Sequence, residues 1–279
     1  MTILRAACIQ MRSTAEVASN IAAATALIQA AAAEGATFIA TPEMTNLLDI
    51  RPGQARSKVK AEADDDCLKA LSELARGLEI TLLIGSLAIA LPDDKRFANR
   101  SYLISPAGEI LARYDKIHMF DVEVGDGQSY RESRTYRAGR TASLAETAMG
   151  RVGMTICYDV RFPHLYRTLG QAGADLITIP SAFTRVTGEA HWHVLVRARA
   201  IETGSFVLAP AQGGHHEDGR ETFGHSLIVS PWGDILAEAD HDEPGYIIAN
   251  LDLADIAKAR ARIPALHNDQ AIALGTTES

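Results

Sequence analysis

Cysteine is scarce in this sequence of 279 residues, which contains only Cys8, Cys67 and Cys157. Such a small and odd number argues against a disulfide-stabilised scaffold and predicts a reducing compartment. Long apolar runs are also missing, since none approaches the roughly 18 residues that a membrane-spanning helix requires. The first eight residues include a short apolar stretch without the charged leader of a signal peptide. We therefore expect a cytoplasmic protein with no membrane partner.

An excess of basic residues is absent as well. The chain has 27 lysines and arginines against 35 acidic residues, which gives a formal net charge of -8. A protein with this balance has no global positive field that would attract nucleic acid or anionic lipid. We therefore expect no nucleic-acid partner.

The common cofactor and metal motifs are also missing. No G-x-G-x-x-G follows a strand, and the chain has no Walker loop, no H-E-x-x-H and no C-x-x-C. His191 and His193 alternate on a predicted helix and so point to different faces. His215 and His216 lie in a glycine-rich loop without acidic residues at ligand spacing. We therefore expect neither a metal nor a cofactor.

Each half of the chain alternates strand-like and helix-like patterns and then continues as a run of strands. Ser13 and Glu16 predict a capping box that opens a helix ending near Gly35. The other predicted helices span 64–76, 162–172 and 188–203. The predicted strands span 3–10, 37–41, 81–90, 100–105, 110–114, 152–157, 175–180, 206–211, 224–230, 235–238 and 246–250.

This duplicated order predicts an α/β fold in which two sheets stack face to face with helices outside, a four-layer αββα sandwich. Hydrophobic residues make up 47% of the chain, which is enough for one large core. We predict a single domain at residues 1–270 and a polar tail at 271–279. Residues 118–140 show little periodicity and predict a long functional loop.

Cys157 ends an apolar, strand-like run that begins at Gly153, and charged residues follow it. In α/β proteins ligands bind where such strands finish, so this thiol is a candidate nucleophile. A cysteine considered alone is more often a small buried hydrophobic residue. The interpretation therefore depends on the groups that accompany it elsewhere in the chain.

Two further charged residues follow predicted strands. Glu43 comes directly after Pro42 at the end of one strand, and Lys116 comes shortly after the strand at 110–114. Each by itself is typical of a solvent-exposed position. Together with Glu132 and the strand-end thiol of Cys157, however, they supply a carboxylate base and an ammonium. These groups can hydrolyse a carbon–nitrogen bond through an acyl-enzyme.

Three segments carry a resemblance to a known family. Pro42-Glu43, Tyr114–Val122 and Cys157–Pro163 resemble, in the same order, the catalytic signatures of the nitrilase superfamily of carbon–nitrogen hydrolases. The likeness extends from the first strand to about Ile263. It implies an αββα sandwich and a cofactor-free hydrolase with a Glu-Lys-Cys triad.

The resemblance implies a role for each residue at a matching position. Cys157 is the implied nucleophile, and Glu43 is the general base that takes its proton and later activates water. Lys116 stabilises the oxyanion, and the backbone N–H of Tyr158 is the expected second donor.

The long loop and the segments after the nucleophile supply further candidates. Glu132 matches the family's second glutamate, which helps to orient substrate and lysine, although Glu123 lies nearby and stays open as an alternative. Arg161 is expected to hold a substrate carboxylate, with an ion pair to Asp159 as the alternative. Phe183 matches an apolar wall of the family's pocket and could equally belong to the core.

The sequence around Cys157 resembles the branch that contains ω-amidase and deaminated glutathione amidase. The segments 197–203 and 211–217 look closer to the latter, whereas Glu189 departs from its pattern. The resemblance therefore implies an amidase whose favoured substrate is deaminated glutathione. Alternatives are ω-amides such as 2-oxoglutaramate and 2-oxosuccinamate, N-carbamoyl compounds, or a catalytically silent scaffold of the same fold.

The family resemblance also implies a homodimer or higher homo-oligomer formed through the helices at 162–172 and 188–203.

Overall fold

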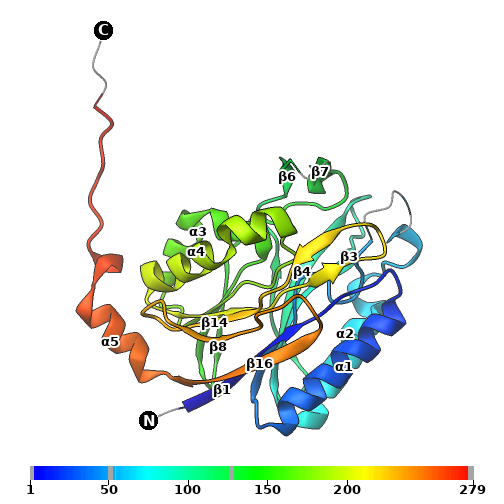
Figure 1. Cartoon of the computed structure of the whole chain (residues 1–279), viewed down its shortest axis with the longest axis horizontal. Coiled ribbons are helices and arrows are strands. Elements are labelled where there is room, and N and C mark those ends of the chain that lie inside the picture. Colours follow the sequence, from blue (N-terminus) through cyan, green and yellow to red (C-terminus); the bar gives the residue numbers. More distant parts are fainter. Residues whose placement is uncertain (1–2, 50–52, 54, 126–128, 276–279) are drawn as a thin grey trace.

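The alternating pattern folds into two six-stranded sheets that stack face to face, with helices on both outer sides (Figure 1). The computed structural model describes residues 3–49, 53, 55–125 and 129–275. The predicted α/β class and its αββα layering are therefore confirmed. Within the described residues, no helix has the length and apolar character that a membrane span needs. The last four residues of the predicted tail lie outside the described part.

The first sheet has the strand order β16-β1-β2-β3-β4-β5. The helices α1 (Val17–Ala33) and α2 (Asp66–Leu78) connect its parallel strands and cover its outer face. Asp65 caps α2 because its side chain accepts a hydrogen bond from the backbone N–H of Leu68 at 2.8 Å. The strands are β1 (Ile3–Gln10), β2 (Phe38–Ala40), β3 (Thr81–Ala90), β4 (Phe97–Ile104), β5 (Ile110–Asp115) and β16 (Gly245–Asp252).

The second sheet has the order β15-β14-β11-β10-β9-β8, and its outer face carries α3 (Pro163–Gln171) and α4 (Arg185–Thr203). Strands β9, β10 and β11 are parallel because one of these helices follows each of the first two. The strands are β8 (Ser143–Thr147), β9 (Gly150–Met154), β10 (Leu176–Thr178), β11 (Phe206–Ala209), β14 (Leu227–Val229) and β15 (Ile235–Glu238).

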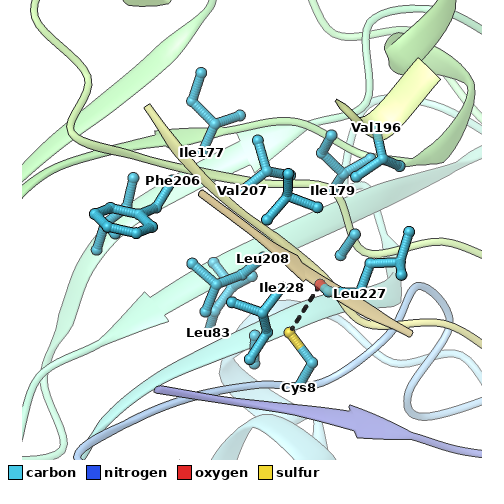
Figure 2. Close-up of a cluster of buried hydrophobic side chains, with 14 of the residues drawn as sticks. Cys8, Leu83, Ile177, Ile179, Val196, Phe206, Val207, Leu208, Leu227 and Ile228 are labelled. Atoms are coloured by element: carbon cyan, nitrogen blue, oxygen red, sulfur yellow. Dashed lines mark hydrogen bonds between the residues drawn. The ribbon is translucent and has the colours of Figure 1, made fainter. Parts of the chain in front are cut away.

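The interior between the two sheets is apolar. Cys8 and Leu83 of the first sheet pack against Leu208 and Ile228 of the second, and Figure 2 shows these side chains on the same side of β11 and β14. All four are 0% exposed. This packing fixes the two sheets relative to each other, so side chains at the carboxyl ends of their strands hold defined positions.

Two short hairpins, one further helix and several 3-10 helices lie outside the two sheets. The hairpins β6 (Asp121–Glu123) with β7 (Ser129–Arg131) and β12 (Gly213–His215) with β13 (Glu221–Phe223) project from it, and α5 (Ala254–Arg262) follows β16. Five short 3-10 helices complete the described elements: η1 (Ala55–Ser57), η2 (Glu62–Asp64), η3 (Glu132–Arg134), η4 (Cys157–Arg161) and η5 (Ala265–His267).

Several local predictions were wrong. The Ser13 capping box does not form, since α1 begins at Val17 and its N-cap residue, Glu16, makes no side-chain cap. The backbone N–H of Ser13 instead donates to Gln212 Oε1 at 2.9 Å, and that of Glu16 donates to Thr14 Oγ1 at 3.0 Å. The predicted loop at 118–140 contains the β6–β7 hairpin and η3. Strand β16 does not extend the second sheet, because it pairs antiparallel with β1 in the first.

Candidate active site

Cys157 begins η4, three residues after β9 ends, and its backbone lies in the left-handed region with φ of 49°. This conformation is costly for a residue with a Cβ, and it persists only where the surroundings enforce it. The backbone N–H of Cys157 donates to the carbonyl of Pro180 at 2.9 Å, which ties the turn to the end of β10. The side chain keeps 7% exposure. A tight turn therefore presents the thiol at the carboxyl end of the second sheet.

Asp159 holds this turn in place. Its buried carboxylate accepts hydrogen bonds from the backbone N–H of Ile156 at 2.9 Å and from the hydroxyl of Tyr114 at 2.7 Å. It also accepts from the backbone N–H of His118 at 3.1 Å. The turn that carries the thiol is thus anchored to the end of β5, two residues from Lys116. The sequence interpretation treated Asp159 only as a possible partner of Arg161 and missed this role.

Glu43 and Lys116 meet beside the thiol. Glu43 follows β2 and Lys116 follows β5, so both come from the carboxyl ends of strands in the first sheet. Lys116 Nζ donates to Glu43 Oε1 at 2.8 Å, and both side chains are almost fully buried. The other carboxylate oxygen of Glu43 accepts from the backbone N–H of Ala182 at 2.8 Å. The carboxylate is therefore held between the two sheets.

Glu132 is the second carboxylate of this centre. Lys116 Nζ donates to its two oxygens at 3.0 and 2.9 Å, and the backbone N–H of Phe120 donates to Oε2 at 2.6 Å. Glu123, the alternative, is exposed on β6 and pairs with Arg131 at 2.7 Å. Of the two glutamates, only Glu132 lies beside Lys116.

Asn99 is a buried residue of β4 that the sequence interpretation did not identify. Its Nδ2 donates to Glu43 Oε1 at 2.9 Å and to Glu132 Oε1 at 3.2 Å. The amide thus separates two carboxylates that share one lysine. In the sequence Asn99 stands next to Arg100, where a polar residue gives no signal of a site. Only its burial in the structure indicates a role, because a buried polar side chain needs hydrogen-bond partners.

The electrostatics of the centre define its resting charges. Burial acts to raise the pKa of Glu43, but the Lys116 ammonium and hydrogen bonds from Lys116, Cys157 and Asn99 lower it below its ordinary value of 4.5. Burial acts to lower the pKa of Lys116, but the charges of Glu132 and Glu43 raise it well above 10.5. Burial and the Glu43 charge raise the pKa of the Cys157 thiol. At neutral pH the centre therefore holds a carboxylate, an ammonium and a neutral thiol.

These groups open into a cavity of about 670 Å³. Tyr158 and Phe183 line it together with Cys157, so both predicted neighbours face the same space. A cavity of this volume accommodates a drug-sized ligand.

Arg161 lies elsewhere. It is not among the described residues that line the cavity, and its Nη1 lies 3.3 Å from His191 Nδ1. Its guanidinium carbon is 5.3 Å from the ring centroid of Phe183 and 6.0 Å from that of Tyr158. Arg161 therefore packs behind two residues of the cavity wall, and its predicted ion pair with Asp159 is not formed.

Three potential metal ligands gather outside this cavity. His193, His225 and Glu238 place one donor atom each within 4.8 Å of the others. Glu238 Oε1 lies 2.8 Å from His193 Nε2 and 3.3 Å from His225 Nδ1. The Glu238 carboxylate therefore lies within hydrogen-bonding distance of both imidazoles.

Comparison with known proteins relates this geometry to a family. The family model described as carbon-nitrogen hydrolase matches residues 5–261. A deaminated glutathione amidase of Synechocystis is 39% identical over 266 residues, covering 94% of this chain and 97% of that protein. The mouse deaminated glutathione amidase is 37% identical, covering 91% and 80% of the two chains.

Solved structures show the same fold. The NitFhit protein of C. elegans has a TM-score of 0.89 at 34% identity, with 96% of this chain covering 65% of that one. Saccharomyces cerevisiae Nit3, a member of branch 10 of the nitrilase superfamily, has a TM-score of 0.85 at 28% identity, and 96% of each chain is covered. The resemblance predicted from the three motifs is confirmed, and this chain belongs to the carbon-nitrogen hydrolase family.

Proposed function

We propose that this protein is a cysteine-dependent amidase whose substrate is deaminated glutathione. The observation that carries the proposal is the contact of Glu43 with Lys116 beside the Cys157 thiol, at the base of a cavity that admits a small molecule. Relatives that cover nearly the whole chain and are named deaminated glutathione amidase support this choice of substrate.

Acylation begins with Glu43 as the general base. The carboxylate takes the thiol proton as the Cys157 sulfur attacks the amide carbon, which forms a C–S bond and moves an electron pair onto the carbonyl oxygen. Lys116 and the backbone N–H of Tyr158 stabilise the resulting oxyanion. The oxyanion then collapses, the C–N bond breaks, and Glu43 returns the proton to the leaving amine. The product is a thioester on Cys157.

In deacylation the Cys157 sulfur is the leaving group and water is the nucleophile. Glu43 takes a proton from water as the water oxygen attacks the thioester carbon, and collapse of the second oxyanion expels the Cys157 sulfur. The proton returns to that sulfur and restores the thiol. For deaminated glutathione the two products are cysteinylglycine and 2-oxoglutarate.

Glu132 acts through Lys116 in this proposal. Two carboxylates around one ammonium keep Lys116 charged and fix its position, and the short bond from Phe120 N–H fixes Glu132 in turn. A lysine paired with Glu43 alone would lose its charged partner whenever Glu43 becomes protonated. Glu132 therefore keeps the ammonium compensated throughout the cycle.

Phe183 and Arg161 are the two residues predicted to bind the substrate. Phe183 lines the cavity, which supports its role as an apolar wall. Arg161 stays a predicted carboxylate ligand, and it reaches the cavity only if its guanidinium leaves His191. The alternative substrates, 2-oxoglutaramate, 2-oxosuccinamate and N-carbamoyl compounds, use the same nucleophile. A silent scaffold would not need a carboxylate and an ammonium buried beside a thiol.

We also propose a cytoplasmic homodimer or higher homo-oligomer. Helix α4 leaves Val194 and Ile201 exposed at 70% and 53%, one heptad apart on its outer face. A second copy that covers this stripe would remove apolar surface from water. Light scattering on wild type and on Val194→Asp tests the assembly, which the variant should weaken.

The deciding experiment for the function is steady-state hydrolysis of deaminated glutathione, 2-oxoglutaramate and an N-carbamoyl amino acid, with Cys157→Ala as the blank. We expect deaminated glutathione to lead in kcat/KM and all activity to disappear in the variant. A lead by another substrate would replace the substrate but keep the mechanism. No activity on any of them, together with an unreactive Cys157, would contradict the amidase proposal.

A further inference from the structure

The cavity carries a positive charge in an acidic protein. The whole chain has a formal net charge of -8. The described residues that line the cavity nevertheless include six basic and only three acidic side chains. Glu43 and Glu132 are already paired with Lys116, and Arg131 is paired with Glu123. Four cations and the carboxylate of Asp49 remain on the described lining, and this excess of positive charge favours an anionic ligand.

Arg220 differs from the other cations of this wall. Apart from Lys116, the basic residues that line the described cavity are Arg56, Lys95, Arg131, Arg134 and Arg220. All are exposed except Arg220, whose Nε is buried and has no hydrogen-bond partner among the described residues. No carboxylate of the described chain lies within ion-pair distance of its guanidinium. A buried guanidinium nitrogen without a partner is costly, and a ligand can supply what is missing.

The backbone around Arg220 is held in place. Arg220 lies just before β13, in the turn that connects it with β12. Its backbone N–H donates to Asp218 Oδ1 at 3.0 Å, and its carbonyl accepts from the backbone N–H of His216 at 2.8 Å. Thr222, two residues later, pairs as a β-bridge with Thr184, another residue of the cavity wall. The guanidinium is thus mounted on a fixed turn.

We infer that Arg220 binds a carboxylate of the substrate, on the half that stays attached to Cys157 as the thioester. This inference rests on the proposed amidase function and specifies its substrate class as an amide whose acyl chain ends in a carboxylate. The leaving amine must depart and water must enter while the acyl half remains bound, so the exposed side of the cavity serves the leaving half. The buried Nε of Arg220 suits the half that stays, and guanidinium matches carboxylate in a bidentate manner.

The test uses a matched pair of amides. Glutaramate and pentanamide have the same carbon chain and differ in that a carboxylate replaces a methyl group. We expect wild type to prefer glutaramate, and Arg220→Met to reduce this preference roughly 10- to 100-fold, as loss of a charge-assisted hydrogen bond predicts. Arg220→Lys keeps the charge without the bidentate geometry, so its preference for glutaramate should lie between those of wild type and Arg220→Met. An unchanged preference in Arg220→Met would overturn the inference.

Two controls separate this inference from the amidase proposal. Arg137→Met removes one positive charge at an exposed pair with Asp93, outside the cavity lining, and should leave the preference unchanged. The second readout needs no turnover: glutarate should protect Cys157 of wild type against alkylation by iodoacetamide, and should not protect Arg220→Met. Equal protection of both proteins, or none in wild type, would refute the carboxylate site even if amidase activity is present. Protection that depends on Arg220 would support it even if no amide is cleaved.

Discussion

Cys8 and Cys157 are both buried cysteines on strands or strand ends, and burial raises the pKa of both thiols. Cys8 is enclosed by apolar side chains of the two sheets, and its Sγ donates to the carbonyl of Leu227, 3.7 Å away (Figure 2). Cys157 has the Glu43 carboxylate and the Lys116 ammonium beside it, and it faces a cavity. Burial is shared, so it cannot by itself make a cysteine catalytic.

The difference between the two thiols comes from the way the sheets meet. At Cys8 the two sheets pack side chain against side chain. At Cys157 the first sheet contributes Glu43, Asn99 and Lys116, while the second contributes the thiol. The charged groups and the nucleophile belong to different sheets, so the site exists only where the strand ends of both are brought together.

Alkylation should show the largest difference between these thiols. In native protein at neutral pH, iodoacetamide should modify Cys157 and leave Cys8 unmodified, because Cys8 becomes accessible only when the core opens. Opening that costs about 5 kcal/mol slows the reaction by roughly 10³ or more. Peptide mass spectrometry over time measures both rates.

Cys67 serves as the internal control. It is buried at 0% exposure, and burial together with the charges of Asp65 and Asp66 raises the pKa of its thiol. Cys8 and Cys67 should therefore label together on unfolding in urea. Labelling of Cys8 at the rate of Cys157 in folded protein would show that the apolar core does not protect Cys8 from the reagent.

The next largest effect is expected for Glu43→Gln, which makes the surroundings of Cys157 more like those of Cys8. The amide keeps the shape but cannot accept the thiol proton. We expect kcat/KM to fall by roughly 10³, within the range typical of a lost general base. Alkylation of Cys157 should slow as well, while the thermal unfolding temperature identifies any loss of folded protein.

The pH profile checks the same residue in wild type. The pKa of Glu43 is lowered, so its carboxylate persists as the pH falls and is protonated only below 4.5. Activity present at neutral pH should therefore be lost with a midpoint below 4.5, measured where circular dichroism shows folded protein. The raised pKa of Lys116 keeps the ammonium charged at least to 10.5. An acid midpoint well above 4.5 would argue against Glu43 as the base.

The sequence predicted the parts of the site that stand directly at strand ends. Glu43, Lys116 and Cys157 follow apolar strands, and three ordered motifs identified the family. The roles of Asn99 and Asp159 were not predicted. Each is a polar residue whose hydrogen-bond partners are distant in the sequence and come close only when the sheets stack.

For the fold, too, local features were predicted and long-range contacts were not. Local apolar patterns located most strands and helices, since burial on one face leaves a period in the sequence. The pairing of β16 with β1 joins the two ends of the chain, and no local pattern specifies a partner so far away. The expected capping box failed because the backbone N–H groups of Ser13 and Glu16, which it needs, donate instead to the side chains of Gln212 and Thr14.

A smaller effect is expected for Asn99→Ala. The change removes one neutral donor from the carboxylates of Glu43 and Glu132, and a lost hydrogen bond to a charged group is worth about 1.5 to 3 kcal/mol, roughly 10- to 100-fold in kcat/KM. The bond from Asn99 helps to lower the pKa of Glu43, so its loss should move the acid limb to higher pH. Asn250→Ala, at an exposed amide of β16, is the matched control. A 10-fold loss with an unmoved acid limb would indicate a purely structural role.

The smallest effect on activity is expected for Cys8→Ala. The change leaves a gap the size of one sulfur in the tightly packed layer between the sheets, which should lower the free energy of unfolding by about 1 to 2 kcal/mol. Activity should stay within about twofold of wild type, because Cys8 lies in the apolar core between the sheets. Cys157→Ala should show the converse, with activity abolished and the free energy of unfolding changed less, since its side chain borders an open cavity. Urea denaturation of both variants measures this. If Cys157→Ala proves the more destabilising of the two, the Cys157 thiol contributes to packing as well as to chemistry. The two cysteines would then differ less than their surroundings predict.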